Sequence, residues 1–264
     1  ENYFTEKKFL FLKLDYIQKP DVSERLLPFT EENHIFGFDQ IDLSEFLGKA
    51  NESKIENVEN DKITVTETED EIILKNNKII YIFDKDIANF SSIMLKGVNL
   101  IEKPVEYNIW RAPTDNDRKI KVIWETMGYN RTKPSVHSVN VEQHIGCVEI
   151  NASLAVTADF IGQIIKLDAC YTVYENGKIE IAINGELQPD FEFLPRFGLR
   201  LFLKQDKNMA EYFGYGPFES YIDKHRASRV GFFRNTVQNM HEDYLKPQEN
   251  GSHYGCHYLS IKDG

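Results

Sequence analysis

Alternating hydrophobic and polar positions dominate this chain and predict strands along most of its length. Between 165 and 173 every second residue is apolar or aromatic, and after Asn176-Gly177 the alternation resumes from Ile179 to Ile183. A period of two places apolar side chains on one face of a sheet. Asn-Gly between two such runs is typical of a type I′ turn. The segment therefore predicts a β-hairpin with a type I′ turn.

Further strand-like runs extend the same pattern. Ile72–Leu74 and Ile79–Phe83 are separated by Lys-Asn-Asn-Lys and predict a second hairpin. Residues 9–17, 197–203 and 254–261 predict single strands, and only 42–50 suggests a short helical turn. The pattern predicts an all-β fold.

A polar stretch divides the chain into two modules. Glu, Asn, Lys and Asp dominate 48–70, and we assign 46–64 to a solvated linker between a first module, 1–45, and a main module, 65–264. The first module is too small to fold alone, so we expect it to supply the closing strands of a larger sandwich. The chain starts inside a strand-like run and stops at Asp263-Gly264, a hairpin-turn dipeptide. We therefore expect a fragment of a longer protein.

Composition narrows the classes of partner. The chain has 42 acidic and 31 basic residues and a net charge of −11, which argues against binding a nucleic-acid backbone. No apolar run approaches the roughly 20 residues that span a bilayer. Cys147, Cys170 and Cys256 lie far apart without a C-x-x-C pair, so we expect neither a zinc site nor disulfides, and a reducing compartment. The seven histidines show no metal spacing, so we predict no metal site.

The most unusual segment is 108–117, Asn-Ile-Trp-Arg-Ala-Pro-Thr-Asp-Asn-Asp. Its acidic end, Asp115, Asn116 and Asp117, fits a loop whose side chains cap their own backbone amides, or a polar cluster that contacts a sugar. Retaining glycosidases need two carboxyls about 5–5.5 Å apart on opposite sides of the bond, and inverting enzymes need about 6.5–9.5 Å. Two carboxylates on one short loop seldom straddle a substrate. We favour a structural role, with contact at a substrate rim as the alternative.

Two other segments combine polar side chains with turn residues. Residues 211–221 join aromatic residues to two glycines, a proline and Glu219, and suit either core packing at a bend or a carbohydrate surface. Residues 246–251 place Gln248, Glu249 and Asn250 before a turn glycine. These three side chains suit either a hydroxylated ligand or the backbone of a buried loop.

In these segments the sequence resembles the C-terminal region of glycoside hydrolase family 2 β-galactosidases. Three motifs match in order: NIWRAPTDND at 108–117, YFGYGPFESYIDK at 212–224 and LKPQENG at 245–251. Supporting matches are Phe83-Asp84-Lys85 with Gly97, Trp124 with Gly128, and Pro195-Arg196-Phe197-Gly198. Phe9 through Gly37-Phe38-Asp39-Gln40 is similar to the closing strands of the Ig-like sandwich that precedes the last domain.

The resemblance implies a large antiparallel supersandwich, galactose mutarotase-like, preceded by the last strands of an Ig-like β-sandwich. The family's two catalytic glutamates lie on a TIM barrel before this region, so the resemblance implies no catalytic residue here. The family's catalytic domain uses Mg and Na, and no cofactor is expected in this part. Arg111 and Trp124 join the polar residues named above as candidates for the substrate rim or for organising loops.

Three hypotheses follow. The chain is an auxiliary part of a β-galactosidase that shapes the substrate pocket and supports assembly, a stand-alone sugar-binding module, or a mutarotase-like protein. The first implies as partners the rest of the chain with its TIM barrel, a galactoside such as lactose, and further copies in a homo-oligomer, with neither nucleic acid nor membrane. It also implies a bacterial, cytoplasmic protein. A mutarotase needs a His acid and a carboxylate base in one cleft, and the scattered histidines rank that hypothesis last.

Overall fold

The structure, a computed structural model, describes residues 9–18, 33–46 and 61–263. These residues divide into two compact units. The first unit takes the described residues up to 46 together with Tyr212–Phe233 and His253–Tyr258. The second takes 61–211, Arg234–Ser252 and 259–263. The predicted linker falls mostly on 47–60, outside the described residues.

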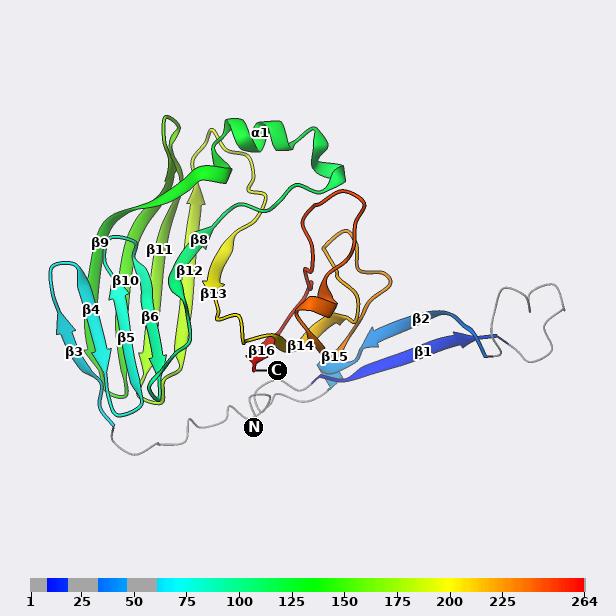
Figure 1. Cartoon of the computed structure of the whole chain (residues 1–264), viewed down its shortest axis with the longest axis horizontal. Helices are drawn as coiled ribbons and strands as arrows, with labels where there is room; N and C mark the ends of the chain where they lie inside the picture. Colours follow the sequence, from blue (N-terminus) through cyan, green and yellow to red (C-terminus); the bar gives the residue numbers. More distant parts are fainter. Residues whose placement is uncertain (1–8, 19–32, 47–60, 264) are drawn as a thin grey trace. The chain divides into compact units, whose positions relative to one another are not determined.

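Strands provide nearly all of the regular structure, which confirms the all-β prediction (Figure 1). The strands are β1 (Phe11–Ile17), β2 (Ile35–Asp42), β3 (Thr64–Glu67), β4 (Glu71–Lys75), β5 (Ile79–Asp84), β6 (Asn89–Leu95), β7 (Val98–Asn99), β8 (Lys103–Asn108), β9 (Thr132–His144), β10 (Cys147–Ala158), β11 (Gly162–Tyr174), β12 (Ile179–Leu187), β13 (Gly198–Phe202), β14 (Met209–Gly216), β15 (Arg229–Thr236) and β16 (Tyr258–Lys262).

Short helical segments complete the described part of the chain. They are α1 (Lys121–Thr126) and the 3-10 turns η1 (Ser44–Phe46), η2 (Asp115–Arg118), η3 (Tyr129–Arg131) and η4 (Gln238–Met240). The turn η1 lies where the sequence suggested a helical turn, whereas α1 was not predicted. Because α1 is a six-residue helix, it is too short to produce a clear helical periodicity.

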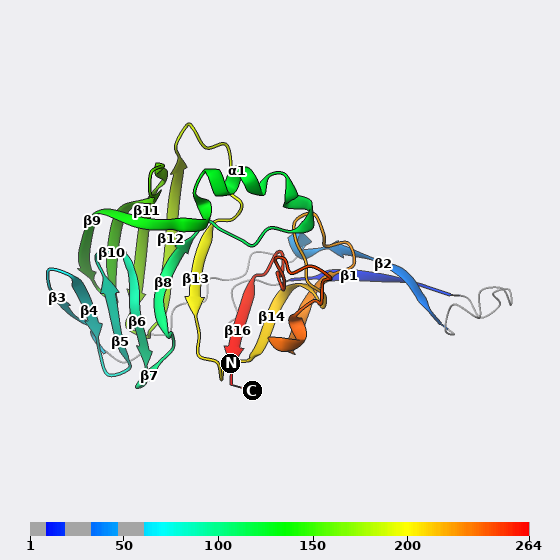
Figure 2. The ribbon, with the colours of Figure 1, turned by 45° about the horizontal axis from the view of Figure 1, so that its top comes forward.

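Two sheets of the second unit stack into a sandwich. One sheet has the order β3-β4-β5-β6-β7 and the other β12-β11-β10-β9, with antiparallel pairing in both. Figures 1 and 2 show the two sheets as adjacent layers. The Tyr171 ring on β11 contacts Phe83 on β5 and Phe90 on β6, at centroid distances of 5.1 and 5.6 Å. The core therefore forms from the inward residues that the period-two pattern predicts.

The predicted hairpins are both present, but the turn of the first differs from the prediction. Gly177 has a φ of 92°, whereas Asn176 is not among the residues with positive φ. The amide of Gly177 donates to the carbonyl of Tyr174, and the amide of Tyr174 donates to the carbonyl of Lys178. This is a type I turn followed by a left-handed glycine. The type I′ prediction is therefore wrong.

The strand predicted at 254–261 begins later than expected. Regular pairing starts at Tyr258, because Gly255 adopts a φ of 59° and turns the chain. A Cβ on Gly214 of β14 would lie 2.8 Å from the Cα of Cys256. The turn thus brings the backbone at Cys256 into direct contact with the backbone of β14, both within the first unit. The strand predicted at 197–203 is confirmed as β13, which pairs with β8.

Candidate functional site

The loop after β8 is fixed by a charged pair. The Arg111 guanidinium donates from Nη1 to Asp117 Oδ2 at 2.5 Å and from Nη2 to Oδ1 at 3.1 Å. Asp117 Oδ2 also accepts the backbone amide of Thr114 at 2.7 Å and its hydroxyl at 2.8 Å. Asp117 therefore caps the backbone amide of Thr114 within its own loop. This is the structural role that the sequence favoured for the segment.

The electrostatics of Asp117 favour its ionised form. Desolvation acts to raise the pKa of this carboxyl, but hydrogen bonds from Arg111 and Thr114 outweigh it, and the pKa is lowered from its usual value. A carboxylate whose two oxygens are engaged by a guanidinium and an N-cap stays charged near neutral pH. Asp117 is thus suited to hold the loop rather than to donate a proton.

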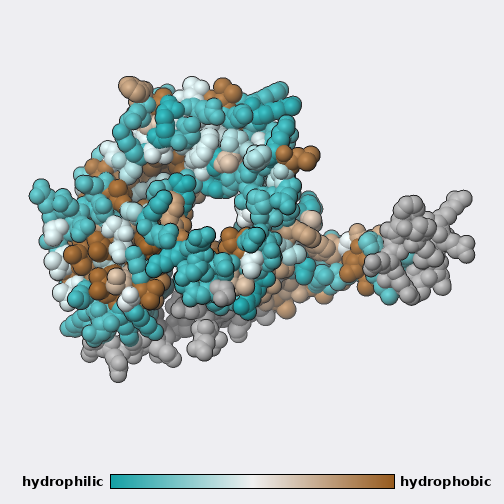
Figure 3. Space-filling model, viewed as in Figure 1, coloured by the Kyte–Doolittle hydropathy of each residue, from teal (hydrophilic) through white to brown (hydrophobic). Residues whose placement is uncertain are grey.

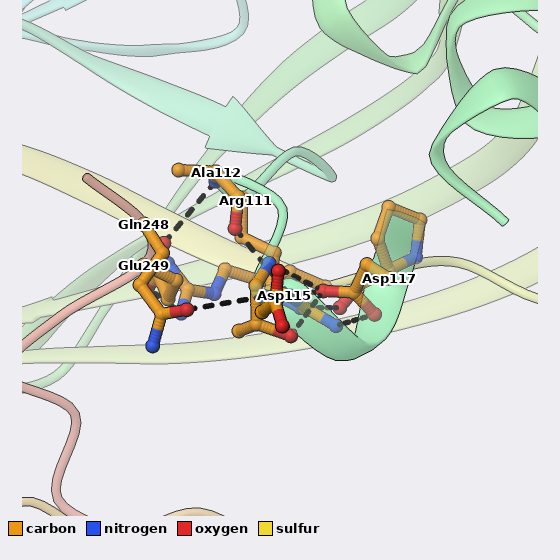
Figure 4. A network of polar contacts seen from close by, with 9 residues as sticks. Arg111, Ala112, Asp115, Asp117, Gln248 and Glu249 are labelled. Atoms are coloured by element: carbon orange, nitrogen blue, oxygen red, sulfur yellow. Dashed lines mark hydrogen bonds and ion pairs between the residues drawn. The ribbon is translucent and has the colours of Figure 1, made fainter. Parts of the chain in front are cut away.

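A distant segment binds the same loop (Figure 4). Gln248 Oε1 accepts the amide of Asp115 at 3.0 Å, and Glu249 Oε2 accepts the amide of Ala112 at 3.2 Å. Glu249 Oε1 forms an ion pair with Arg196. The two hydrogen bonds to the backbone of the loop join residues more than 130 positions apart in the sequence.

Arg196 and Pro195 connect a third segment to this cluster. The Arg111 Nε donates to the Pro195 carbonyl at 3.3 Å, beside the ion pair of Arg196. The motifs at 108–117 and 245–251 and the supporting match at 195–198 therefore meet in one network of polar contacts, which we name the loop network. Arg196 was not among the candidate residues, although its place in the Pro-Arg-Phe-Gly match was the signal that pointed to it.

Trp124 supports the loop network from α1. Its side chain is 2% exposed, the Trp110 ring meets it edge-on at 6.2 Å, and the Arg111 guanidinium lies 4.8 Å from its ring centre. A guanidinium over an indole face is a favourable cation–π contact. The indole Nε1 is buried without a hydrogen-bond partner among the described residues. Trp124 is therefore a packing residue beneath Arg111.

The remaining candidates lie elsewhere or have local partners. Asn250 accepts the amide of Glu242 at 3.0 Å and closes its own loop. Asn116 lies in η2 between the two aspartates. Glu219 belongs to the first unit, where its carboxylate is 1% exposed and pairs with Lys224 at 2.6 Å. The structure thus brings together Arg111, Asp115, Asp117, Gln248 and Glu249.

No triad of His, Cys, Asp or Glu side chains lies within metal-binding reach of one another in residues 9–18, 33–46 and 61–263. All three cysteines are free thiols. Within the same ranges, no helix has both the length and the apolar character that a bilayer crossing requires.

The fold and the loop network define a β-sandwich domain whose long polar loops are held by ion pairs and backbone hydrogen bonds. A family profile described as the beta galactosidase small chain matches residues 75–264. The chain is 38% identical over 256 residues to a β-galactosidase of Actinobacillus pleuropneumoniae, covering 96% of this chain and 24% of that protein. A β-galactosidase of Staphylococcus xylosus is 31% identical, and the match covers 95% of this chain and 26% of that protein. A β-galactosidase of Kluyveromyces lactis is 31% identical over 205 residues, covering 72% of this chain and 19% of that protein.

The chain belongs to the β-galactosidase small chain family. It spans about a quarter of the length of the first two relatives, so it corresponds to one part of a larger protein of that kind.

Proposed function

We propose that this chain is the C-terminal part of a β-galactosidase that hydrolyses terminal β-D-galactosides such as lactose with retention of configuration. In this proposal the chain breaks no bond itself. It orders the loop 112–118 at the rim of the substrate pocket and supports assembly with the rest of the protein and with further copies. The names of the relatives support the reaction class.

The observation that carries the proposal is the loop network. Glu249 and Gln248 hold the backbone amides of Ala112 and Asp115, while Asp117 engages Arg111 and Thr114. A loop tied at three points retains a fixed shape, and fixed positioning groups are what a substrate rim requires. The same contacts occupy the polar groups that a stand-alone sugar site would offer to a ligand.

The chemistry of retention supports placing the catalytic pair outside this chain. Retaining hydrolysis needs one carboxylate as nucleophile and one carboxylic acid as proton donor, about 5–5.5 Å apart across the bond. Asp117 is held ionised by Arg111, and Asp115 lies two positions away on the same 3-10 turn. We infer that the two catalytic carboxylates come from a TIM barrel elsewhere in the protein.

The residues of this chain do not fit the metal ions that the resemblance implies for the catalytic domain. Within the part of the chain that the structure describes, no three acidic, His or Cys side chains converge, whereas Mg²⁺ is usually held by carboxylate oxygens and water. No step of the proposal passes through a metal bound here.

The first unit supports a role in assembly. The β1–β2 hairpin carries large hydrophobic side chains that are 43–59% exposed, among them Leu12, Leu14, Ile35 and Phe36, and Figure 3 shows brown and tan surface along this hairpin. Exposed apolar patches of this kind mark protein interfaces. We propose that β1 and β2 are closing strands of an Ig-like sandwich, with 65–264 as the separate supersandwich domain.

Kinetics of the protein that carries this chain test the proposal. Glu249→Ala is expected to lower kcat/KM for lactose at least about tenfold, because two loop contacts disappear together. Lys166→Ala, on an exposed strand position, is the control and is expected to leave turnover unchanged. Hydrolysis of lactose by the 264-residue chain alone would overturn the non-catalytic role, and binding of free galactose by that chain would favour the sugar-binding module instead.

A further inference from the structure

A second site lies in the second unit, next to the loop network, with which it shares Trp110. A cavity of about 560 Å³ is formed by the end of β5 and the turn after it, strand β8, η3 with the start of β9, and Arg200 of β13. Figure 2 shows β8 and β13 as neighbouring strands. Ligand pockets typically enclose about 300–1,000 Å³. The cavity is therefore large enough for a monosaccharide with a substituent.

The charge of the lining is opposite to that of the chain. Four cationic side chains line the cavity, against two carboxylates, in a chain of net charge −11. The cations are Lys103, Arg131, Lys133 and Arg200, and the carboxylates are Asp84 and Glu106. A local excess of cations within an acidic protein attracts an anion and repels other cations.

Both carboxylates already have donors. Arg200 contacts Glu106 Oε2 through Nε at 3.1 Å and through Nη2 at 2.5 Å, and Asp84 Oδ1 accepts the backbone amide of Asp86 at 2.8 Å. Lys133 pairs with Asp159, but this pair is more than 60% exposed on both sides and contributes little. Arg131 donates from Nη1 to the Glu125 carbonyl at 3.0 Å and to Asn130 Oδ1 at 3.4 Å, and both acceptors are neutral. Lys103 and Arg131 form no ion pair within the described residues, so they are the cations best placed to meet an anionic group.

Aromatic residues make the cavity wall rigid. The Tyr107 hydroxyl donates to the Ala88 carbonyl at 2.9 Å and lies 2.7 Å from the Tyr171 hydroxyl. The Tyr129 hydroxyl donates to the Phe193 carbonyl at 2.9 Å. The half-buried Tyr107 and Trp110 contribute carbon surface to the lining, and Tyr129, which is buried, supports the wall from behind. Such surface packs well against the C–H face of a sugar ring.

We propose that this cavity binds an anionic monosaccharide, either a hexose phosphate or a hexuronate. The cations would bind the phosphate or carboxylate through charge-assisted hydrogen bonds, and the aromatic wall with Asn130 and Thr132 would contact the ring and its hydroxyls. The site depends on this chain alone and does not rest on the proposed hydrolase activity.

Isothermal titration calorimetry on the full protein tests this site. The probes are glucose 6-phosphate and glucuronate, with galactose and inorganic phosphate as comparisons. We expect at least one of the two anionic sugars to bind more tightly than both comparisons, with an affinity that falls as salt rises. The double variant Lys103→Gln/Arg131→Gln is expected to weaken that binding at least about tenfold, while Lys166→Gln leaves it unchanged.

Both substituted side chains are exposed, so an unchanged thermal midpoint should accompany the loss of binding. The double variant also assigns any binding to this cavity rather than to a galactoside site. The proposal is overturned if neither anionic sugar binds, if galactose or inorganic phosphate binds as tightly, or if the double variant retains full affinity.

Discussion

The guanidinium of Arg111 donates hydrogen bonds to both carboxylate oxygens of Asp117, at 2.5 and 3.1 Å, and the two residues are only six positions apart in the sequence. The two side chains are 20% and 13% exposed, so the pair is partly shielded from water. Parallel N–H···O contacts of this kind fix orientation as well as distance. The pair sets the shape of the loop to which Gln248 and Glu249 then bind.

Asp117→Asn is expected to lower the free energy of unfolding by about 2–3 kcal/mol, because it removes a charge-assisted pair that is only partly solvated. Urea unfolding of the protein measures this loss. Asp159→Asn serves as the control, since its pair with Lys133 is exposed on both sides and should contribute at most about 1 kcal/mol. Equal losses for the two variants would mean that burial does not strengthen the Arg111 pair.

Trp124→Ala is expected to destabilise the protein by about 3–5 kcal/mol, because it empties a core position under Arg111 and beside Trp110. Trp124→Phe should cost less, since it keeps an aromatic ring there and removes a buried N–H without a described partner. Thermal unfolding compares the two variants. A large loss of turnover with an unchanged unfolding midpoint in Trp124→Ala would instead assign Trp124 to substrate contact.

Gly177→Ala is expected to destabilise the hairpin of β11 and β12 by more than about 1 kcal/mol. The residue has a φ of 92°, and a Cβ would lie 3.1 Å from Ile79 Cγ2 and 3.2 Å from the Tyr81 hydroxyl. Gly97 provides the control, because its φ is also positive, at 79°, but a Cβ would meet open space. Chemical denaturation should therefore show a greater loss for Gly177→Ala than for Gly97→Ala, and the reverse order would refute the close packing of this turn.

His253 is expected to make the first unit sensitive to mild acid. Burial lowers the pKa of this imidazole, although the Tyr215 carbonyl and the charge of Glu219 act to raise it. A lowered folded-state pKa means that stability is present above the unfolded value of 6.5 and is lost as the pH falls through the folded value. Unfolding free energies at pH 7, 6 and 5 measure this slope.

The slope between pH 7 and pH 5 should be smaller in His253→Gln than in the unmodified protein. His144→Gln is the matched control, because it makes the same change at a ring that is 47% exposed. An identical slope in all three proteins would show that the protonation of His253 does not influence folding.

The sequence by itself determined the class of fold and the faces of the strands. The alternation from Ile165 to Val173 correctly identified the inward residues of β11. Successive side chains of a strand point to opposite faces, so a sheet buried on one face has an apolar residue at every second position. The ordered motifs also pointed to the polar loops. The turn at Asn176-Gly177 was assigned to the wrong type because both types accept this dipeptide, and the register of the flanking strands selects between them.

Only the tertiary structure decided which loops meet and which rings are buried. No local pattern links Gln248 with Asp115, or Arg196 with Glu249, because such contacts form only after the sheets have closed and brought distant loops together. The same reason explains why Trp124, on a helix of six residues, was not recognised as a core residue. Hydrophobic periodicity shows which face of a segment is buried. The partner of a polar side chain depends instead on which distant segments the fold brings next to it.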